Sequence, residues 1–305
     1  MERTVNKGIA FLVYTNIFIA ACAFALTAET FLLLKLPASA NWYLPLLFCC
    51  TLFVYNLHYY VKTGTKKTGS RLAWCRSHKG LLLSLLWMSG LLIAGIVVTH
   101  FMELFFTGDS LNYGNISLFI FVPFAVLAYS HSIIPGSKKA LRQQGWLKMI
   151  LLSAAWSFTT TLLPVIMLMH GSTGSLSAAK LAVLFLHRFL FIAALSVLFN
   201  IKDQEEDKAD GVKTIAVLLG PAKTLRYGQW FVFLTNLAAS LLVLYVFGLH
   251  HPAFYAAVIL PCGLLFLSYH RFRPAGEEAF FVVRYDGLMI IKALLLIFAL
   301  LSFTV

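Results

Sequence analysis

The chain has 305 residues, of which 60% are hydrophobic and only 12% are charged. A soluble globular protein is nearer half apolar and a quarter charged, so this composition excludes an ordinary soluble domain. The net charge of +12 would suggest a nucleic-acid partner on a soluble protein. Membrane proteins, however, gather Lys and Arg in their cytoplasmic loops, so we expect a lipid bilayer and no nucleic acid.

Long apolar runs recur along the whole chain and predict an all-α membrane protein with nine transmembrane helices, each near the ~20 residues that a bilayer crossing needs. The predicted spans are residues 10–34, 42–61, 80–99, 116–134, 149–169, 182–199, 230–248, 253–269 and 287–304. We expect a single transmembrane domain over residues 1–305. The five cysteines form no CxxC pair and are expected to be small core residues.

The loops between these spans differ in charge, and the difference orients the protein. Basic residues gather at the N-terminus and in the second, fourth, sixth and eighth loops, whereas the alternate loops carry almost none. Because Lys and Arg favour the cytoplasmic side, we expect the N-terminus inside and the C-terminus outside. For most of these basic residues, the preference of Lys and Arg for the cytoplasmic side is enough to explain their presence in the loops.

An acidic stretch follows the sixth predicted span. Five of the twelve acidic residues fall within residues 203–210. If the helix continues, Asn200, Asp203 and Asp207 lie on one face at positions i, i+3 and i+7. Carboxylates on one face repel each other unless a cation joins them, and Mg²⁺ takes one or two carboxylates together with substrate phosphate oxygens. The alternative is a solvated turn balanced by nearby lysines.

The acidic stretch begins a longer pattern, D-x3-D-x3-G-x2-T-x2-V-x2-G. It is formed by Asp203, Asp207, Gly211, Thr214, Val217 and Gly220. The pattern resembles the second aspartate-rich motif of the UbiA family of intramembrane aromatic prenyltransferases, which follows the sixth of nine helices on the cytoplasmic side. The family's usual form begins with another Asp three residues earlier, where this chain has Asn200.

The resemblance implies a bundle around a lipid-facing cavity, where Mg²⁺ on aspartates holds an isoprenyl diphosphate. The diphosphate leaves, and a lipophilic or aromatic acceptor attacks the allylic carbocation. Asp203 and Asp207 would then be catalytic metal ligands, with Asn200 beside them, because Mg²⁺ stabilises the charge of the leaving diphosphate. We expect an integral protein of a bacterial inner membrane, with the loops of the active site facing the cytoplasm.

The family's first motif, N-D-x2-D-x3-D, belongs at the end of the second span, and this chain departs from it. Asn56 matches, but the three aspartate positions hold Leu57, Tyr60 and Gly64. Three explanations are open: diphosphate bound with fewer metals, a binding relative that has lost catalysis, or a different substrate. A helix C-cap is the alternative role for Asn56.

Cations could replace the missing first metal. Lys62 and His58 lie near Asn56, and Arg71 occupies an offset at which the family often has an arginine. Lys148, which opens the fifth span, is the best match for a lysine that contacts diphosphate in the family, with Tyr129 and Arg142 behind it. We therefore expect Lys62, Arg71 and Lys148, supported by Asn56, to hold the diphosphate.

Two basic residues lie inside predicted spans, where charge is costly. Arg188 lies roughly 22 Å along the sixth helix from Asp203, and we expect it to be structural and to snorkel outward. Lys292 is poorly spaced to pair with Asp286 in its own span and can instead meet a carboxylate of another helix.

The leading interpretation is therefore a Mg²⁺-dependent prenyltransferase. One alternative is a non-catalytic isoprenoid-binding or assembly protein on the same scaffold, and another is a terpene cyclase of the same family. A transporter is the third class, but no pair of Gly- or Pro-broken spans marks an inverted repeat. Binding of Mg²⁺ together with diphosphate separates the enzyme from the scaffold.

Overall fold

The structure is a computed structural model that describes residues 6–37, 41–65, 69–107, 145–168, 177–272 and 278–303. These residues form helices and turns, with no β-strand among them. Seven of their helices are long and apolar enough to cross a membrane, and one bent helix pair passes the same test. The predicted span at 116–134 lies outside the described residues, so the count of nine and the orientation of the N-terminus stay predictions.

The chain divides into two compact units. The first comprises residues 1–31, 35–113 and 275–293, and the second comprises residues 32–34, 114–274 and 294–305. Helices α2 and α14 pass from one unit into the other, so each unit contains segments that are distant in sequence. The single domain expected over the whole chain stays a prediction.

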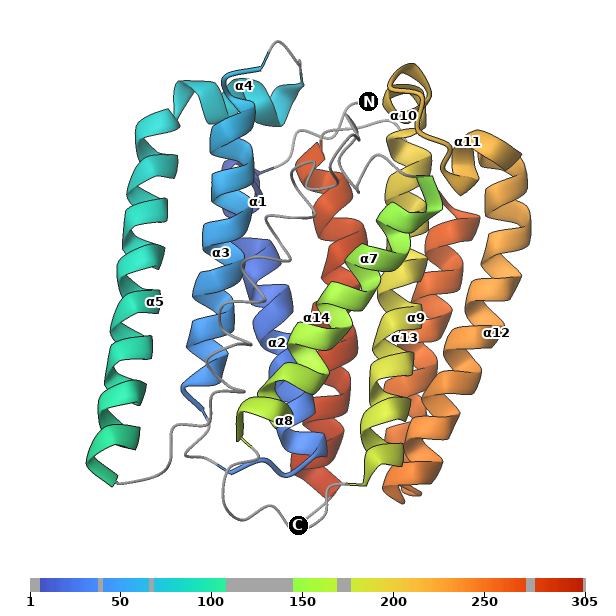
Figure 1. Cartoon of the computed structure of the whole chain (residues 1–305). Helices are drawn as coiled ribbons and strands as arrows, with labels where there is room; N and C mark the ends of the chain where they lie inside the picture. The colour runs from blue at the N-terminus through green and yellow to red at the C-terminus, as the bar shows by residue number, and fades with distance from the viewer. Residues whose placement is uncertain are drawn as a thin grey trace, which may run out of the picture. The chain divides into compact units, whose positions relative to one another are not determined.

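The first unit contains α1 to α5 and the first part of α14 (Figure 1). Their bounds are α1 (Lys7–Tyr14), α2 (Ile17–Leu33), α3 (Tyr43–Lys62), α4 (Ser70–Ser77), α5 (Lys79–Thr107) and α14 (Glu278–Phe303). Helix α3 packs along α5, and the short α4 contacts α1, α3 and α5. Helix α4 therefore closes the polar end of the α3–α5 pair.

The second unit is built on α9, which contacts α7, α11 and α12, while α13 packs on α12 (Figure 1). The bounds are α7 (Gly145–Ser157), the π-helix η3 (Phe158–Leu162), α8 (Leu163–Leu168), α9 (Ala178–Lys202), α10 (Gln204–Ala209), α11 (Ile215–Leu219), α12 (Pro221–Phe247) and α13 (Pro252–His270). The buried hydroxyl of Tyr269 donates to the carbonyl oxygen of Ala194 at 2.6 Å, which ties α13 to α9.

Eight predicted spans coincide with described helices, but three helices extend well beyond the predicted ends. Helix α5 continues to Thr107, α12 begins at Pro221, and α14 begins at Glu278. Hydropathy marks only the apolar part of a helix, whereas backbone hydrogen bonding continues into polar turns. At α12 the start is fixed by Gly220, with φ of 79°, and by a proline in the first turn.

The first predicted span, 10–34, is wrong as one continuous helix. Helices α1 and α2 meet at an angle of 70°. Asn16 lies at the break with a positive φ of 65°, a conformation that Asn tolerates better than most residues. The carbonyl oxygen of Val13 accepts from the N–H of Asn16 at 3.1 Å, which closes the end of α1.

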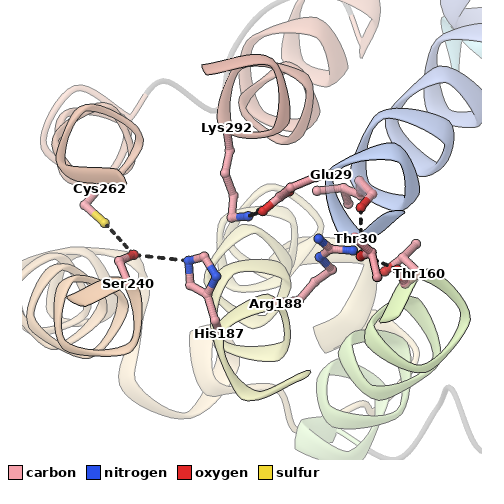
Figure 2. A network of polar contacts seen from close by, with 9 residues as sticks. Glu29, Thr30, Thr160, His187, Arg188, Ser240, Cys262 and Lys292 are labelled. Carbon is pink, nitrogen blue, oxygen red and sulfur yellow. Dashed lines mark hydrogen bonds and ion pairs between the residues drawn. The ribbon is translucent and has the colours of Figure 1, made fainter. Parts of the chain in front are cut away.

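A buried ion pair links α2 and α14 within the first unit. The Lys292 ammonium lies 2.7 Å and 3.0 Å from the two carboxylate oxygens of Glu29, and both residues are buried. Figure 2 shows the two side chains pointing toward each other. The expectation that Lys292 meets a carboxylate of another helix is confirmed, because a buried charge in a membrane needs a close partner.

A buried polar row joins three helices of the second unit (Figure 2). The hydroxyl of Ser240 on α12 lies 3.1 Å from Nε2 of His187 on α9 and 3.6 Å from Sγ of Cys262 on α13. The Ser240 hydroxyl thus contacts polar atoms of both neighbouring helices, which ties the three helices together. All five cysteines are free. Four of them are buried, which confirms for these four the expectation that they are core residues, whereas Cys50 is half-buried.

The expectation that Arg188 snorkels outward is wrong. Its side chain is fully buried, and its guanidinium donates to the carbonyl oxygen of Thr160 at 3.0 Å. In a regular α-helix that oxygen would accept from the N–H of residue 164, which is Pro164 and has none. Because Pro164 has no N–H to donate, the carbonyl oxygen of Thr160 in η3 is available to accept from Arg188.

Candidate functional site

The end of α9 separates the acidic residues into two groups. Asp203 is the C-cap of α9, and its carbonyl oxygen accepts from the N–H of Asp207 at 2.9 Å, so the chain continues in nearly helical form into α10. Asn200 and Asp207 are buried and Asp203 is half-buried, whereas the other three acidic residues of the stretch are exposed. The three residues of the predicted face are therefore the ones withdrawn from solvent.

The remaining residues of the motif lie at the ends of short helices, and this explains their spacing. Gly211 adopts a positive φ of 70° after α10, which glycine accepts without steric cost. The hydroxyl of Thr214 caps α11 by accepting from the N–H of Val217 at 3.4 Å. Gly220 then joins α11 to α12 with φ of 79°. These turns fold the segment back after the carboxylates and fix where α9 ends.

Helix α7 brings Lys148 to the same place. It begins at Gly145, which has a positive φ of 47° and lies so close to the carbonyl oxygen of Lys213 that a side chain there would overlap it. The start of α7 is thus pressed against the segment that follows Asp207. One turn later, the Lys148 ammonium lies 3.4 Å from Oδ1 of Asp207.

Two buried polar atoms in this cluster lack a hydrogen-bond partner within the part of the chain that the structure describes. They are Nδ2 of Asn200 and Oδ2 of Asp207. Burial raises the pKa of both Asp203 and Asp207 above the ordinary aspartate value, while Lys148 acts on both in the opposite direction. Unsatisfied buried polar groups cost free energy, so they mark a place where a ligand can bind favourably.

The residues at the end of α3 form a separate cluster within the first unit. Oδ1 of Asn56 accepts from Nδ2 of Asn16 at 3.0 Å. Nδ2 of Asn56 donates to the carbonyl oxygens of Thr15 and Leu52 at 3.0 Å and 2.9 Å. Asn56 is fully buried and lies inside α3, so the alternative role as a helix C-cap is wrong. Its amide instead holds the break between α1 and α2.

Arg71 completes this break cluster, which we define as Asn16, Asn56 and Arg71. The guanidinium donates to the carbonyl oxygen of Val13 at 3.0 Å and to Oδ1 of Asn16 at 2.6 Å. It also forms an ion pair with Glu278 at 3.3 Å. These contacts leave Nε as the one nitrogen of Arg71 without a hydrogen-bond partner among the described residues.

An aromatic ring connects the predicted cations of this unit. Arg71 lies over the ring of Tyr59 at 3.9 Å, and the ammonium of Lys62 lies 5.5 Å from the centre of the same ring. Asn56 and Arg71 therefore share Asn16 as a partner, and Lys62 and Arg71 share the ring of Tyr59. That these residues hold a diphosphate stays a prediction. Sequence reasoning missed Glu278 and Asn16, although an asparagine within an apolar run was a visible signal.

A group of three His, Cys, Asp or Glu side chains placed to hold a metal ion does not occur among the described residues. The cluster at the end of α9 nevertheless fits Mg²⁺ on its donor chemistry. It offers two carboxylates and an amide, and Mg²⁺ characteristically takes one or two carboxylates and completes its shell with water and phosphate oxygens. The unpartnered Oδ2 of Asp207 is the atom best suited to such an ion.

Comparison with known proteins now decides the family. The family model described as the UbiA prenyltransferase family matches residues 83–282, which is more than half of the chain. The chain belongs to the UbiA family. The match includes Lys148, Asn200, Asp203 and Asp207, whereas Asn56 and the three positions without aspartate precede it.

A solved structure supports the fold of this UbiA family member. The apo structure of a UbiA homolog from Aeropyrum pernix K1 is similar with a TM-score of 0.61 and 15% sequence identity, over 94% of this chain and 98% of that one. At this identity the likeness shows the fold alone. No curated protein matches the chain. The family and the apolar helices together indicate an integral membrane protein with a prenyltransferase type of function.

Proposed function

We infer that this UbiA family member is a Mg²⁺-dependent membrane prenyltransferase, which moves an isoprenyl group from an isoprenyl diphosphate to a lipophilic or aromatic acceptor. The observation that carries the proposal is the cluster at the end of α9. Among the described residues, it combines a buried carboxylate with one unpartnered oxygen, a buried amide with an unpartnered nitrogen, and a lysine 3.4 Å from that carboxylate. A purely structural cluster would satisfy these atoms internally.

Each residue of the cluster has a proposed role. Asp203 and Asp207 hold the metal, and Asn200 supports it through its amide oxygen or donates its Nδ2 to a phosphate oxygen. Lys148 binds the diphosphate as a point charge. The predicted diphosphate contacts of Asn56, Lys62 and Arg71 stay predictions. The break cluster already uses most of the polar atoms of Asn56 and Arg71.

The proposed reaction breaks the bond between the allylic carbon and the bridging oxygen of the diphosphate. The electron pair leaves with the diphosphate, and the carbocation is attacked by an electron pair of the acceptor, which then loses a proton to solvent or a base. Mg²⁺ supplies stabilisation of the negative charge that develops on the leaving group. Lys148 stabilises the same charge, and the apolar helices exclude water from the cation.

The proposed location follows from the charge of the loops. The basic stretch around α4 and the segment from α10 to the start of α12 carry most of the described loop lysines and arginines, which favours the cytoplasmic side. We propose a bacterial inner membrane, with the end of α9 facing the cytoplasm. The isoprenyl chain would then reach the site from the bilayer.

Calorimetric titration of the purified chain in detergent tests the proposal. Geranylgeranyl diphosphate is titrated with and without Mg²⁺, on the wild type and on the double variant Asp203→Asn, Asp207→Asn. We expect binding to require Mg²⁺ and to be lost in the double variant. Binding that ignores both the metal and the substitutions would contradict the assignment of the site, and no binding at all would contradict this donor.

A further inference from the structure

The contact between Lys148 and Asp207 has a consequence for the order in which ligands bind. The Lys148 ammonium lies 3.4 Å from Oδ1 of Asp207, while Oδ2 of the same carboxylate has no partner among the described residues. Lys148 is itself only about a quarter exposed, at 26%. One oxygen of the principal carboxylate is therefore held by a charge that belongs to the protein, and the other is available.

The charges around Asp207 determine how strongly its contact with Lys148 affects metal binding. Asn200 is neutral at the position that begins the acidic face, so Asp203 and Asp207 are the two carboxylates of that face that attract a divalent cation. Lys148 cancels part of that attraction and repels a metal ion that approaches Asp207, since like charges a few ångström apart oppose each other. A diphosphate reverses the effect, because its anionic oxygens can accept the ammonium and also complete the shell of the metal.

We propose that Lys148 is an internal counter-ion of this site: it suppresses binding of the metal alone and moves from Asp207 to the diphosphate when both ligands arrive. Metal and diphosphate then bind with positive coupling, and each raises the affinity for the other by the same factor. The inference rests on the proposed function. It explains why the site would bind a metal ion only weakly until the diphosphate is present.

The start of α7 fixes Lys148 in reach of both partners. Gly145 holds this end of the helix against the carbonyl oxygen of Lys213, so the backbone at Lys148 cannot move far from Asp207. The flexible four-carbon stem of lysine can still redirect the ammonium. The exchange therefore needs a side-chain rotation and no movement of a helix.

The test measures Mn²⁺ binding to the full chain in detergent by the spin-resonance signal of free Mn²⁺, with and without inorganic pyrophosphate. A titration without protein corrects for the complex of Mn²⁺ with pyrophosphate. The variants are Lys148→Met, Lys148→Arg and Lys208→Met. Lys208 is exposed and adjacent to Asp207 in sequence, so its substitution removes a lysine charge from the helix that carries Asp207 and is the matched control.

We expect Lys148→Met to bind Mn²⁺ alone about tenfold more tightly than the wild type, with the gain due to pyrophosphate reduced by a similar factor. Lys148→Arg keeps the charge and should behave like the wild type. Lys208→Met should change Mn²⁺ binding by less than about twofold, because exposed charges are screened. If Lys148→Met does not fold, Lys148→Gln gives the same test.

Two failures can be told apart. If the wild type binds Mn²⁺ with pyrophosphate but Lys148→Met binds Mn²⁺ alone no more tightly than the wild type, the counter-ion role is overturned and the proposed site stands. If the wild type binds no Mn²⁺ even with pyrophosphate, the proposed function falls together with this inference.

Discussion

The end of α9 and the break between α1 and α2 both gather buried polar residues, but they use them differently. In the break cluster, the side chains of Asn16, Asn56 and Arg71 bond to each other and to backbone oxygens, and only Nε of Arg71 lacks a hydrogen-bond partner among the described residues. At the end of α9, a buried carboxylate oxygen and a buried amide nitrogen have no partner in the part of the chain that the structure describes. Between these two regions, unused bonding capacity on a carboxylate and an amide, more than burial or charge, distinguishes the candidate site from the structural cluster.

Asp207→Asn is expected to have the largest effect of the substitutions that test the difference between the two regions, and the effect is a loss of function. The substitution removes the negative charge that attracts the metal but keeps the shape of the side chain. We expect catalytic turnover and Mg²⁺-dependent diphosphate binding to fall by about 10³-fold, because charge stabilisation is usually the largest catalytic contribution. Calorimetric binding and product formation measure this loss.

The folded state should tolerate the same substitution. Asp207 is an unfavourable place for a charge, as its raised pKa indicates, so removing the charge should change the melting temperature little. A large fall in melting temperature with metal binding intact would contradict the proposed site. The end of α9 would then be a structural cluster, like the break cluster. Glu205→Gln, an exposed acid of the same stretch, is the matched control.

Arg71→Met is expected to show the opposite pattern. It removes the guanidinium that donates to Oδ1 of Asn16, to the carbonyl oxygen of Val13 and to Glu278. Removing one partner of a buried charged network costs about 3 kcal/mol of the free energy of unfolding. Thermal unfolding in detergent measures the loss, and Mn²⁺ binding at the end of α9 should stay unchanged.

The control for Arg71→Met is Arg76→Met, an exposed arginine on the same helix, for which a small change in melting temperature is expected. If Arg71→Met instead keeps its melting temperature and loses pyrophosphate binding, Arg71 is a diphosphate residue and its role in holding the break is secondary.

Asn56→Leu should have a smaller effect in the same direction. It keeps the branched shape of the side chain but leaves Nδ2 of Asn16 and the carbonyl oxygen of Thr15 without the Asn56 amide as a partner. Each buried unsatisfied group costs about 1–3 kcal/mol, so we expect a loss of about 2 kcal/mol. The double variant with Asn16→Ala should lose less than the sum of the single variants, since the two amides share a bond. Strict additivity, measured by thermal unfolding, would contradict the shared role.

Much of the fold could be predicted from the sequence because a bilayer imposes long apolar runs. The break at Asn16 could not, since its stability comes from Asn56 and Arg71, which lie far along the chain. Arg188 was misjudged for a related reason. Pro164 removes the helical donor to the carbonyl oxygen of Thr160, and only the packing of α9 against α7 and η3 brings the guanidinium to it.

Part of the candidate site could be predicted from the sequence, because residues of its motif also form the turns and caps of helices. The capping roles of Gly211, Thr214 and Gly220 fix the spacing after the two aspartates, so the pattern survives in a single sequence. The contact between Lys148 and Asp207 was visible only through the resemblance. Gly145, which positions Lys148, gave no signal, because its positive φ and its approach to Lys213 depend on tertiary packing.

The smallest predicted effect sharpens the comparison at Asn200. Asn200→Asp adds a third carboxylate to the metal-binding face and should tighten Mn²⁺ binding in the absence of pyrophosphate by about tenfold, since a further negative charge lies within a few ångström of the ion. The same change removes the Nδ2 donor, which has no protein partner among the described residues, so the gain due to pyrophosphate should shrink. Spin-resonance titration of Mn²⁺ measures both, with Asn200→Leu as the control that removes the amide without adding a charge. If Asn200→Asp and Asn200→Leu bind Mn²⁺ equally, the unpartnered amide does not face the metal, and unused bonding capacity alone does not identify a ligand position.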